Sequence, residues 1–272
     1  MKLLKTLVSL LAAFSVLTVC AAASDGYEAI AIYYDGFKTE WQGLLVGKTT
    51  YVPFEDVNDI LSDGSADISG TASKMTSKSP LVTVNAAAYS LYIEAEGRYL
   101  AGNCLILNGK LYVPVRTIAA AYDADVYWND PTRSVELYSG SGAITDGDSY
   151  YSSDEVYWLS RIISAEAKGE PFEGKVMVGN VILNRVASES FPDTIYDVIF
   201  DRKFGVQFTP IINGSIYDTP TAESVIAAKL CLEGYSLSED AMYFLNPKWA
   251  TNFWVPNNRP YITTVGSHDF YG

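Results

Sequence analysis

The chain opens with an apolar run that follows two lysines. The run extends from Leu7 to Val19, and a small-x-small pattern ends at Ala23. This order is typical of a secretory signal peptide, and the run is shorter than a stable membrane-spanning helix requires. We therefore predict a signal peptide over residues 1–23 and an exported protein with no integral membrane segment after cleavage. The alternative is a lipid anchor at Cys20, but the valine before it does not fit the small residue expected there.

Residues 28–138 contain an internal repeat of strand and helix patterns. The segment Gly47-Lys-Thr-Thr-Tyr-Val-Pro-Phe54 is echoed by Gly109-Lys-Leu-Tyr-Val-Pro-Val115. Each Tyr-Val-Pro precedes a short helical pattern, over 55–61 or 116–122, and then a new strand. Alternating strands are separated by three turn signals, Asp35-Gly36, Glu96-Gly97 and Asn108-Gly109. Each copy of the repeat therefore predicts an α+β unit.

A polar stretch separates the repeat from a region of helical periodicity. Residues 139–153 are rich in Gly, Ser and Asp, which predicts a flexible linker and the main domain boundary. The patterns beyond it predict helices ending near Gly169, over about 171–188, about 194–200 and about 219–234, and strands over 242–245 and 261–265. We expect an α+β protein in which a repeat-built α+β domain (residues 28–138) precedes a mainly helical domain (residues 154–272) with a small β-hairpin region.

Composition and charge narrow the chemistry. The formal net charge is −13, which argues against nucleic-acid binding because that needs a basic face. The sequence has one histidine, His268, so a multi-histidine zinc site is excluded, and we predict neither a metal nor a cofactor. Beyond the predicted signal peptide, Cys104 and Cys231 lie in apolar and helical patterns, so we expect two buried cysteines rather than a disulfide framework.

One acidic residue lies on the apolar side of a predicted helix. Leu159, Ile163 and Glu166 follow one another at spacings of four and three, so Glu166 shares the apolar stripe near the helix end. Desolvation and the negative end of the helix dipole both raise the pKa of such a carboxyl group. A carboxylic acid that stays protonated near neutral pH is what a general acid at a glycosidic oxygen requires. The alternative is a structural glutamate that pairs with Arg161, Lys168 or another cation, or lies in solvent.

The motifs around Glu166 resemble those of a known enzyme family. The segment Ser164-Ala-Glu-Ala-Lys-Gly-Glu-Pro171, followed by Asn184-Arg-Val, is similar to the spore cortex-lytic cell-wall hydrolases of the SleB type. Further motifs of that family recur in order: Phe191-Pro-Asp-Thr-Ile, Gln207-Phe-Thr-Pro, Ala241-Met-Tyr-Phe-Leu-Asn-Pro, Trp254, Arg259-Pro and Gly266-x-His. The resemblance covers about residues 155–272. It implies a lysozyme-like, lytic-transglycosylase-related fold, a peptidoglycan substrate and Glu166 as the catalytic acid.

A second similarity concerns the residues that contact sugar. Phe204-Gly-Val-Gln-Phe-Thr209 is similar to the Gly-Leu-Gln-Phe-Ser strand of resuscitation-promoting, lysozyme-like wall enzymes. This resemblance implies that Gln207 lines the sugar cleft near the catalytic glutamate. We therefore predict that Gln207 and its neighbours Phe208 and Thr209 bind substrate, the alternative for Gln207 being a turn amide.

Three more residues complete the predicted substrate site. Asn246 belongs to a matched family motif. Trp254 lies in an aromatic, Pro/Asn-rich loop, and exposed aromatic side chains on loops often stack on sugar rings. The alternative is that Trp254 holds its own loop in place. Glu170 is either an auxiliary acid, base or orienting residue or a cap of the next helix, since Pro171 follows it. His268 matches the Gly-x-His motif, and we expect it to have a structural hydrogen-bonding role.

The second copy of the N-terminal repeat has a resemblance of its own. Val113-Pro-Val-Arg116, a helix and Asp125-Val-Tyr-Trp128 are similar to the copper-amine-oxidase N-terminal-like stalk domain of exported proteins from Gram-positive anaerobes. The first copy departs from this pattern, since Glu55 or Asp56 replaces the arginine and no tryptophan follows. The resemblance implies a non-catalytic module for positioning or wall attachment.

These features predict an enzyme that cleaves peptidoglycan glycan strands between N-acetylmuramic acid and N-acetylglucosamine. Because no second carboxylate takes a clear nucleophile role, we favour lytic-transglycosylase chemistry with Glu166 as the single acid/base, in spore cortex lysis during germination. The alternatives are a hydrolytic muramidase or glucosaminidase on the vegetative wall, a cysteine peptidase using Cys231 and His268, and a non-catalytic wall-binding scaffold. We expect a cell-wall, extracellular or spore-associated protein whose partner is the peptidoglycan glycan strand.

Overall fold

The computed structural model describes residues 27–203 and 205–272. The predicted signal peptide lies outside the described residues. The chain divides into two compact units: the first ends at Thr145, and the second comprises Gly97–Tyr99 and Asp146–Gly272. In the described chain, every helix is too short or too polar to cross a membrane.

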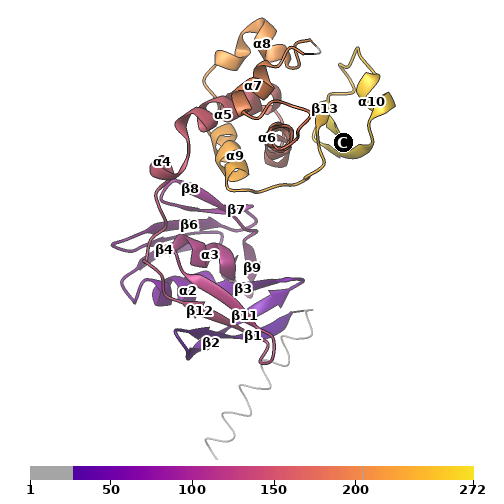
Figure 1. The fold of residues 1–272 in the computed structure, drawn as a ribbon. Coiled ribbons are helices and arrows are strands. Elements are labelled where there is room, and N and C mark those ends of the chain that lie inside the picture. Colours follow the sequence, from indigo (N-terminus) through magenta and orange to yellow (C-terminus); the bar gives the residue numbers. More distant parts are fainter. Residues whose placement is uncertain (1–26, 204) are drawn as a thin grey trace, which may run out of the picture. The chain divides into compact units, whose positions relative to one another are not determined.

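Up to Tyr138, the described residues form one seven-stranded and one five-stranded sheet (Figure 1). The strands of the first sheet are β1 (Glu28–Tyr34), β2 (Phe37–Val46), β3 (Thr49–Pro53), β9 (Leu105–Leu107), β10 (Lys110–Pro114), β11 (Asp125–Asn129) and β12 (Ser134–Tyr138). Those of the second are β4 (Asp67–Thr71), β5 (Lys74–Lys78), β6 (Thr83–Ala87), β7 (Tyr92–Ala95) and β8 (Arg98–Ala101). The first sheet has the order β11-β12-β1-β2-β3-β10-β9, with β1 and β12 parallel, and the second follows chain order.

The two copies of the repeat pair with each other through their Tyr-Val-Pro segments. Val52 of β3 lies opposite Val113 of β10 in an antiparallel pair. Each strand leads into a short helix that begins after its proline, α2 (Phe54–Leu61) or α3 (Val115–Ala121), which confirms the predicted helices. All three predicted turns are confirmed too, because both residues of each turn have positive φ, as tight hairpin turns between twisted strands require. The two copies of the repeat are therefore joined directly within one sheet.

The second unit is mainly helical and ends in a small antiparallel sheet (Figure 1). Its helices are α4 (Gly147–Tyr150), α5 (Ser153–Ala167), α6 (Phe172–Val186), α7 (Ile195–Phe200), α8 (Thr209–Asn213), the 3-10 turn η2 (Ser215–Tyr217), α9 (Ala222–Leu232) and α10 (Trp254–Asn258). Its strands are β13 (Tyr243–Leu245), β14 (Tyr261–Val265) and β15 (His268–Tyr271), in the order β13-β15-β14. Helices α5, α6 and α9 pack on one another. This architecture confirms the predicted α+β class, with a mainly helical second half and a small hairpin region.

Side-chain caps set where the helices of the second unit begin. Ser152 caps α5, since its Oγ accepts a hydrogen bond from the backbone N–H of Glu155 at 3.4 Å. Thr221 caps α9 by accepting from the N–H of Ser224 at 3.2 Å. Helix α9 therefore begins at Ala222, later than the predicted start near residue 219.

Part of the predicted flexible linker has regular structure. Helix α4 lies within residues 139–153, and Asp146 caps it by accepting a hydrogen bond from the backbone N–H of Ser149 at 3.0 Å. Tyr151, which follows α4, is buried. A stretch of Gly, Ser and Asp fits a loop and a helix cap equally well, so composition alone missed this turn of helix.

Candidate active site

Glu166 lies in the last turn of α5, as its spacing predicts. The residue is partly exposed, but its carboxyl group is shielded enough from water that burial raises its pKa to about 7. Neither predicted cation partner reaches it: Arg161 stacks on the ring of Tyr157, 3.9 Å from the ring centroid, and Lys168 is exposed. Among the described residues, no hydrogen bond or ion pair engages the Glu166 carboxyl group. This carboxyl group is therefore available for proton transfer near neutral pH.

The helix end that carries Glu166 is held by its neighbours. The Oγ of Ser164 accepts a hydrogen bond from the backbone N–H of Thr221 at 3.2 Å, which ties α5 to the start of α9. On the other side, α6 approaches closely at Gly179, where a Cβ would lie 3.0 Å from Cδ1 of Ile163. The carboxyl group is thus presented by packed helices rather than by a loop, which favours precise placement.

Glu170 fixes the turn between β14 and β15. Its Oε2 accepts a hydrogen bond from the backbone N–H of Ser267 at 2.7 Å, and its Oε1 accepts one from the Ser267 hydroxyl. Gly266 in the same turn has a φ of 59°, and a Cβ there would overlap the Glu170 carboxylate. Partial burial raises the pKa of Glu170, but the hydrogen bonds from Ser267 and nearby positive charge outweigh this effect and leave the pKa below its usual value. The structure thus ties Glu170 to the hairpin rather than to a cap of α6.

A buried lysine secures the same segment. Lys175 of α6 is 2% exposed, and its Nζ donates a hydrogen bond to the backbone carbonyl of Glu170 at 2.6 Å. The ammonium group also lies 3.1 Å from Oε2 of Glu223 in α9. Sequence reasoning missed this residue, because a lysine in the first turn of a helix reads as solvent-exposed.

His268 lies under the aromatic side chains of the small sheet. It is 7% exposed, and its ring lies 5.3 Å from that of Phe244 in an edge-to-face arrangement. Burial lowers the pKa of His268, although the charges of Glu170 and Asp269 act in the opposite direction. In the described part of the chain, its Nδ1 has no hydrogen-bond partner. The residue is therefore structural through packing, and the predicted hydrogen bond is not found at Nδ1.

Of the three candidate residues 207–209 at the start of α8, two are exposed and one is buried. Gln207 is exposed, and its Nε2 donates to the backbone carbonyl of Gly205 at 3.0 Å, which is the turn contact of the alternative interpretation. Thr209, the first residue of α8, is also exposed. Phe208 is 3% exposed and packs near Phe244, with ring centroids 6.3 Å apart. Gln207 and Thr209 are therefore accessible to a substrate, whereas Phe208 belongs to the core.

A buried arginine connects this segment to the small sheet. Arg185 of α6 is 5% exposed, and its Nε donates to the backbone carbonyl of Met242 at 2.8 Å. Its guanidinium carbon lies 5.0, 5.4 and 5.3 Å from the ring centroids of Phe191, Phe208 and Tyr243. Burial lowers the pKa of Arg185 to about 10. In the sequence, Arg185 belongs to a matched motif, but no role could be predicted for it. Its contacts with three aromatic rings and the Met242 carbonyl show that it holds these segments together.

Asn246 and Trp254 lie on either side of an aromatic loop. The Oδ1 of Asn246 accepts a hydrogen bond from the backbone N–H of Lys248 at 3.0 Å, which forms a local turn. Trp254, the first residue of α10, is 50% exposed, with its ring centroid 6.4 Å from that of Tyr243. The loop exposes two further large aromatic side chains, Trp249 and Phe253, and Tyr261 at the start of β14 is exposed as well. Trp254 therefore both packs on its own domain and presents a face suited to a sugar ring.

The two cysteines outside the predicted signal peptide are free and buried, as predicted. Burial raises the pKa of Cys104 and of Cys231 to about 12, so neither thiol ionises near neutral pH. The Sγ of Cys231 lies in the helical core, 3.5 Å from the carbonyl of Val176. This geometry gives no support to a cysteine peptidase.

Comparison with known proteins shows what this site is similar to. Residues 169–271 match the model described as Cell Wall Hydrolase. A stretch of 120 residues is 38% identical to the spore cortex-lytic enzyme of Bacillus cereus, covering 44% of this chain and 45% of that protein. The C-terminal domain is therefore similar to the cell wall hydrolase family. The match to the family model begins after Glu166, so it contains Glu170 and Gln207 but not the candidate catalytic acid.

Other relatives of this chain carry the same description. The spore cortex-lytic enzymes of Oceanobacillus iheyensis and Bacillus subtilis are 38% and 37% identical over 120 residues, which cover 42% and 38% of those proteins. The chain thus spans less than half the length of these curated relatives. Among solved structures, the catalytic domain of the germination-specific lytic transglycosylase SleB from Bacillus anthracis is 36% identical, with 45% of this chain and 98% of that chain covered and a TM-score of 0.42. The catalytic domain of Bacillus cereus SleB is 37% identical, with 45% and 92% covered and a TM-score of 0.41.

The N-terminal part of this chain matches a second family model. The model described as Copper amine oxidase N-terminal domain matches residues 35–137 and 93–180. The resemblances to the spore cortex-lytic cell-wall hydrolases and to the copper-amine-oxidase N-terminal-like domain are therefore confirmed.

Proposed function

We propose that this protein cleaves the peptidoglycan glycan strand between N-acetylmuramic acid and N-acetylglucosamine, with Glu166 as its single acid/base. The observation that carries the proposal is the Glu166 carboxyl group, which is unpaired among the described residues and has a pKa raised to about 7. The match of residues 169–271 to the cell wall hydrolase model and the identity to spore cortex-lytic enzymes support the substrate class.

The proposed reaction uses the two protonation states of Glu166 in turn. Protonated Glu166 donates to the glycosidic oxygen as the bond from C1 of N-acetylmuramic acid breaks, and the sugar's 2-acetamido group stabilises the positive charge at C1. The 6-hydroxyl of the same sugar then attacks C1 while the Glu166 carboxylate takes its proton. The products are a 1,6-anhydro end and a free 4-hydroxyl, and the acid is regenerated.

The position of Glu170 supports a single-acid mechanism. Two-carboxylate glycosidases need a second carboxylate as nucleophile or base. Glu170 is the carboxylate nearest in sequence, and Ser267 donates to both of its oxygens at the β14–β15 turn. A carboxylate held in this way supports the hairpin, so the substrate's own acetamido group fills the missing role.

We infer that the site of action is the spore cortex and that the protein is exported to reach it. The curated relatives are described as spore cortex-lytic enzymes, and the similar solved domain as germination-specific. The apolar run behind two lysines at the start of the sequence supports export. Gln207, Thr209, Asn246 and Trp254 are our candidates for contact with the glycan strand, because each lies at or near the surface of the second unit.

Product analysis tests this proposal. Purified cortex peptidoglycan and vegetative peptidoglycan are digested separately, and the soluble fragments are examined by mass spectrometry. We expect 1,6-anhydro-muramic ends, with faster release from cortex. New reducing ends without anhydro products would show hydrolysis instead. Binding to both walls without any soluble fragment would establish the scaffold alternative and overturn the proposal.

A further inference from the structure

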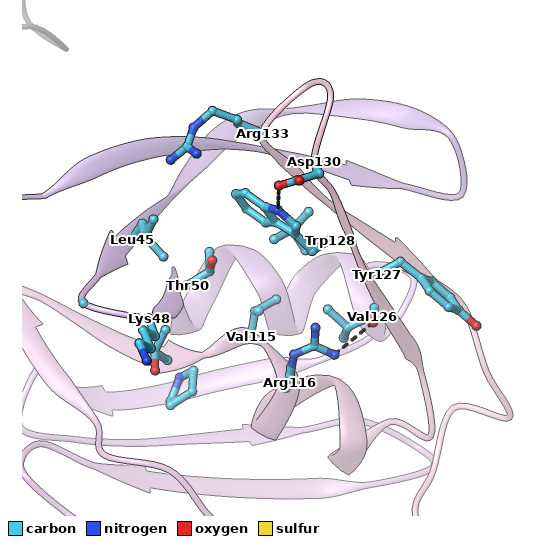
Figure 2. Close-up of a pocket in the computed structure, with 14 residues that line it drawn as sticks. Leu45, Lys48, Thr50, Val115, Arg116, Val126, Tyr127, Trp128, Asp130 and Arg133 are labelled. Atoms are coloured by element: carbon cyan, nitrogen blue, oxygen red, sulfur yellow. Dashed lines mark hydrogen bonds between the residues drawn. The ribbon is translucent and has the colours of Figure 1, made fainter.

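The N-terminal domain contains a pocket that the proposed cleavage does not use (Figure 2). It has a volume of about 400 Å³ and lies between the β2–β3 turn, the start of α3 and the β11–β12 hairpin. Small-molecule sites typically occupy clefts of about 300–1,000 Å³. This pocket is therefore large enough for a sugar ring with a charged substituent.

The pocket gathers the motif residues to which no function has yet been given. Arg116 and Trp128 approach it from different elements, with Val115 between them in Figure 2. The indole Nε1 of Trp128 donates a hydrogen bond to Oδ1 of Asp130 at 2.9 Å, which fixes the plane of the ring. Arg116 uses Nη1 to bond the backbone carbonyl of Val126 at 3.1 Å, which holds the guanidinium at the pocket. An aromatic wall and a cation are thus both oriented before any ligand arrives.

The charge of the pocket is opposite to that of the protein. Residues 28–138 contain eight Lys or Arg and fourteen Asp or Glu, yet three of those cations and one of those acids line the pocket. The three cations are Lys48, Arg116 and Arg133. Glu28 neutralises Arg133 through two hydrogen bonds of 2.9 and 2.6 Å. Within the described chain, Lys48 and Arg116 form no ion pair, so they leave a net positive site on a protein of net charge −13.

The first copy of the repeat provides an internal comparison. Glu55 stands where the second copy has Arg116, since each is the second residue after the proline of Tyr-Val-Pro. The pocket beside Glu55 also contains a tryptophan, Trp41, but it is lined by four acids and one lysine. The positive pocket is therefore not a general consequence of the repeat, because it combines Arg116 of the second copy with Lys48 of the first.

We propose that the pocket lined by Lys48, Arg116 and Trp128 binds an anionic saccharide of the bacterial cell wall. The sugar ring packs against Trp128, and its phosphate or carboxylate substituent accepts hydrogen bonds from Arg116 and Lys48. The choice of the wall as the source rests on the proposed function, whereas the ligand chemistry follows from the pocket. The domain is then a wall-binding module that keeps the enzyme near its substrate.

Co-sedimentation with wall sacculi tests this site. The full chain carrying Glu166→Gln is the parent, so that binding is measured without cleavage, and soluble fragments are assayed in the same tubes. Three preparations serve as probes: untreated sacculi, acid-extracted sacculi without phosphate polymers, and extracted sacculi with amidated carboxylates. The double variant Lys48→Glu/Arg116→Gln should weaken binding to untreated sacculi about tenfold, since two charged contacts are lost.

The matched control is Lys78→Glu, which repeats the charge reversal of Lys48→Glu on β5 outside this pocket. It should bind within about twofold of the parent, since one exposed charge contributes little. If the effect of the double variant disappears on acid-extracted sacculi, the ligand is a phosphate polymer; if it persists there and disappears after amidation, the ligand is a carboxylated glycan. Equal binding by the double variant and the control on untreated sacculi would overturn the proposal. Soluble fragments from the parent would contradict the role of Glu166 without affecting this result.

Discussion

Glu166 lies where ionisation of its carboxyl group costs free energy, and no cation or hydrogen-bond donor among the described residues offsets that cost. A buried carboxyl group without a cation resists ionisation, and that resistance raises its pKa to about 7. The residue is thereby held close to the midpoint of its titration at neutral pH, where one group both gives and takes a proton readily. The Glu166 carboxyl group can therefore serve as both the acid and the base of the proposed reaction.

The rate of glycan cleavage should report this pKa directly. Because the first step requires protonated Glu166, kcat/KM should fall about tenfold per pH unit above pH 7. Initial rates of fragment release from soluble glycan strands, measured between pH 5 and 9, give the profile. Circular dichroism over the same range checks that the protein remains folded. A flat profile up to pH 8.5 would exclude Glu166 as the titrating acid.

The same burial should appear in stability. The folded-state pKa of Glu166 lies above the ordinary value of 4.5, so its contribution to stability is fully present below pH 4.5 and is lost as pH rises through 7. Glu166→Gln should therefore match wild type near pH 4 and exceed its free energy of unfolding by about 3 kcal/mol at pH 8. Scanning calorimetry at the two pH values measures the difference. The exposed control Glu189→Gln should show no such pH dependence, and a variant no more stable than wild type at pH 8 would contradict the desolvated site.

Periodicity revealed Glu166 because a charge on an apolar stripe is visible in the sequence. Lys175 and Arg185 were not predictable in this way, since their burial depends on partners far along the chain. Lys175 pairs with Glu223 of α9, and Arg185 lies among aromatic rings from three segments. Residues whose roles rest on long-range contacts carry no local pattern by which sequence reasoning finds them.

At the scale of elements, the β14–β15 hairpin depends on a carboxylate from the end of another element. Ser267 donates two hydrogen bonds to Glu170, and Gly266 leaves room for the carboxylate. This contact explains the Gly-x-His pattern: the glycine leaves room for the Glu170 carboxylate, and His268 packs in the strand that follows. The hairpin is in this way held to the segment that follows Glu166.

A double-mutant cycle tests this arrangement. Gly266→Ala places a Cβ against the Glu170 carboxylate at a positive φ and should lower the free energy of unfolding by about 1–3 kcal/mol. Glu170→Ala should cost about 1–2 kcal/mol through the lost hydrogen bonds, discounted because the group is partly exposed to solvent. Together the two changes should cost less than their sum by at least about 0.5 kcal/mol, because the overlap disappears with the carboxylate. Denaturant unfolding of the four proteins gives the coupling, and strict additivity would show that the two residues do not interact.

Element types were predictable, whereas some boundaries and one short helix were not. The predicted turns at Asp35-Gly36 and Asn108-Gly109 form because their residues favour positive φ, a local property. Helix α9 begins at Ala222 because Thr221 caps it, and α4 forms because Asp146 caps it. A Thr or Asp is compatible with both a loop and a cap, so the choice between them is made by the packing of the helix that follows.

At the scale of the whole molecule, we propose that the two units divide binding and chemistry between them. The net charge of −13 opposes attraction to an anionic wall, so the proposed contact must come from local sites rather than from the overall field. The pocket lined by Lys48, Arg116 and Trp128 supplies positive charge in the first unit, and the proposed chemistry and sugar contacts belong to Glu166 and the exposed aromatic side chains in the second. The sequence predicted the two families from their motifs, but the pocket became visible only when the two repeat copies were paired in space.

A comparison of three proteins tests whether Glu166 is the acid/base of glycan cleavage. Wild type, Glu166→Gln and the control Glu189→Gln are incubated with the same purified cortex peptidoglycan, and the rate of soluble fragment release is measured. Removing a general acid typically costs about 10²–10⁴-fold, so Glu166→Gln should release fragments at least about a hundredfold more slowly than wild type while Glu189→Gln retains the wild-type rate. Equal release by wild type and Glu166→Gln would contradict the account.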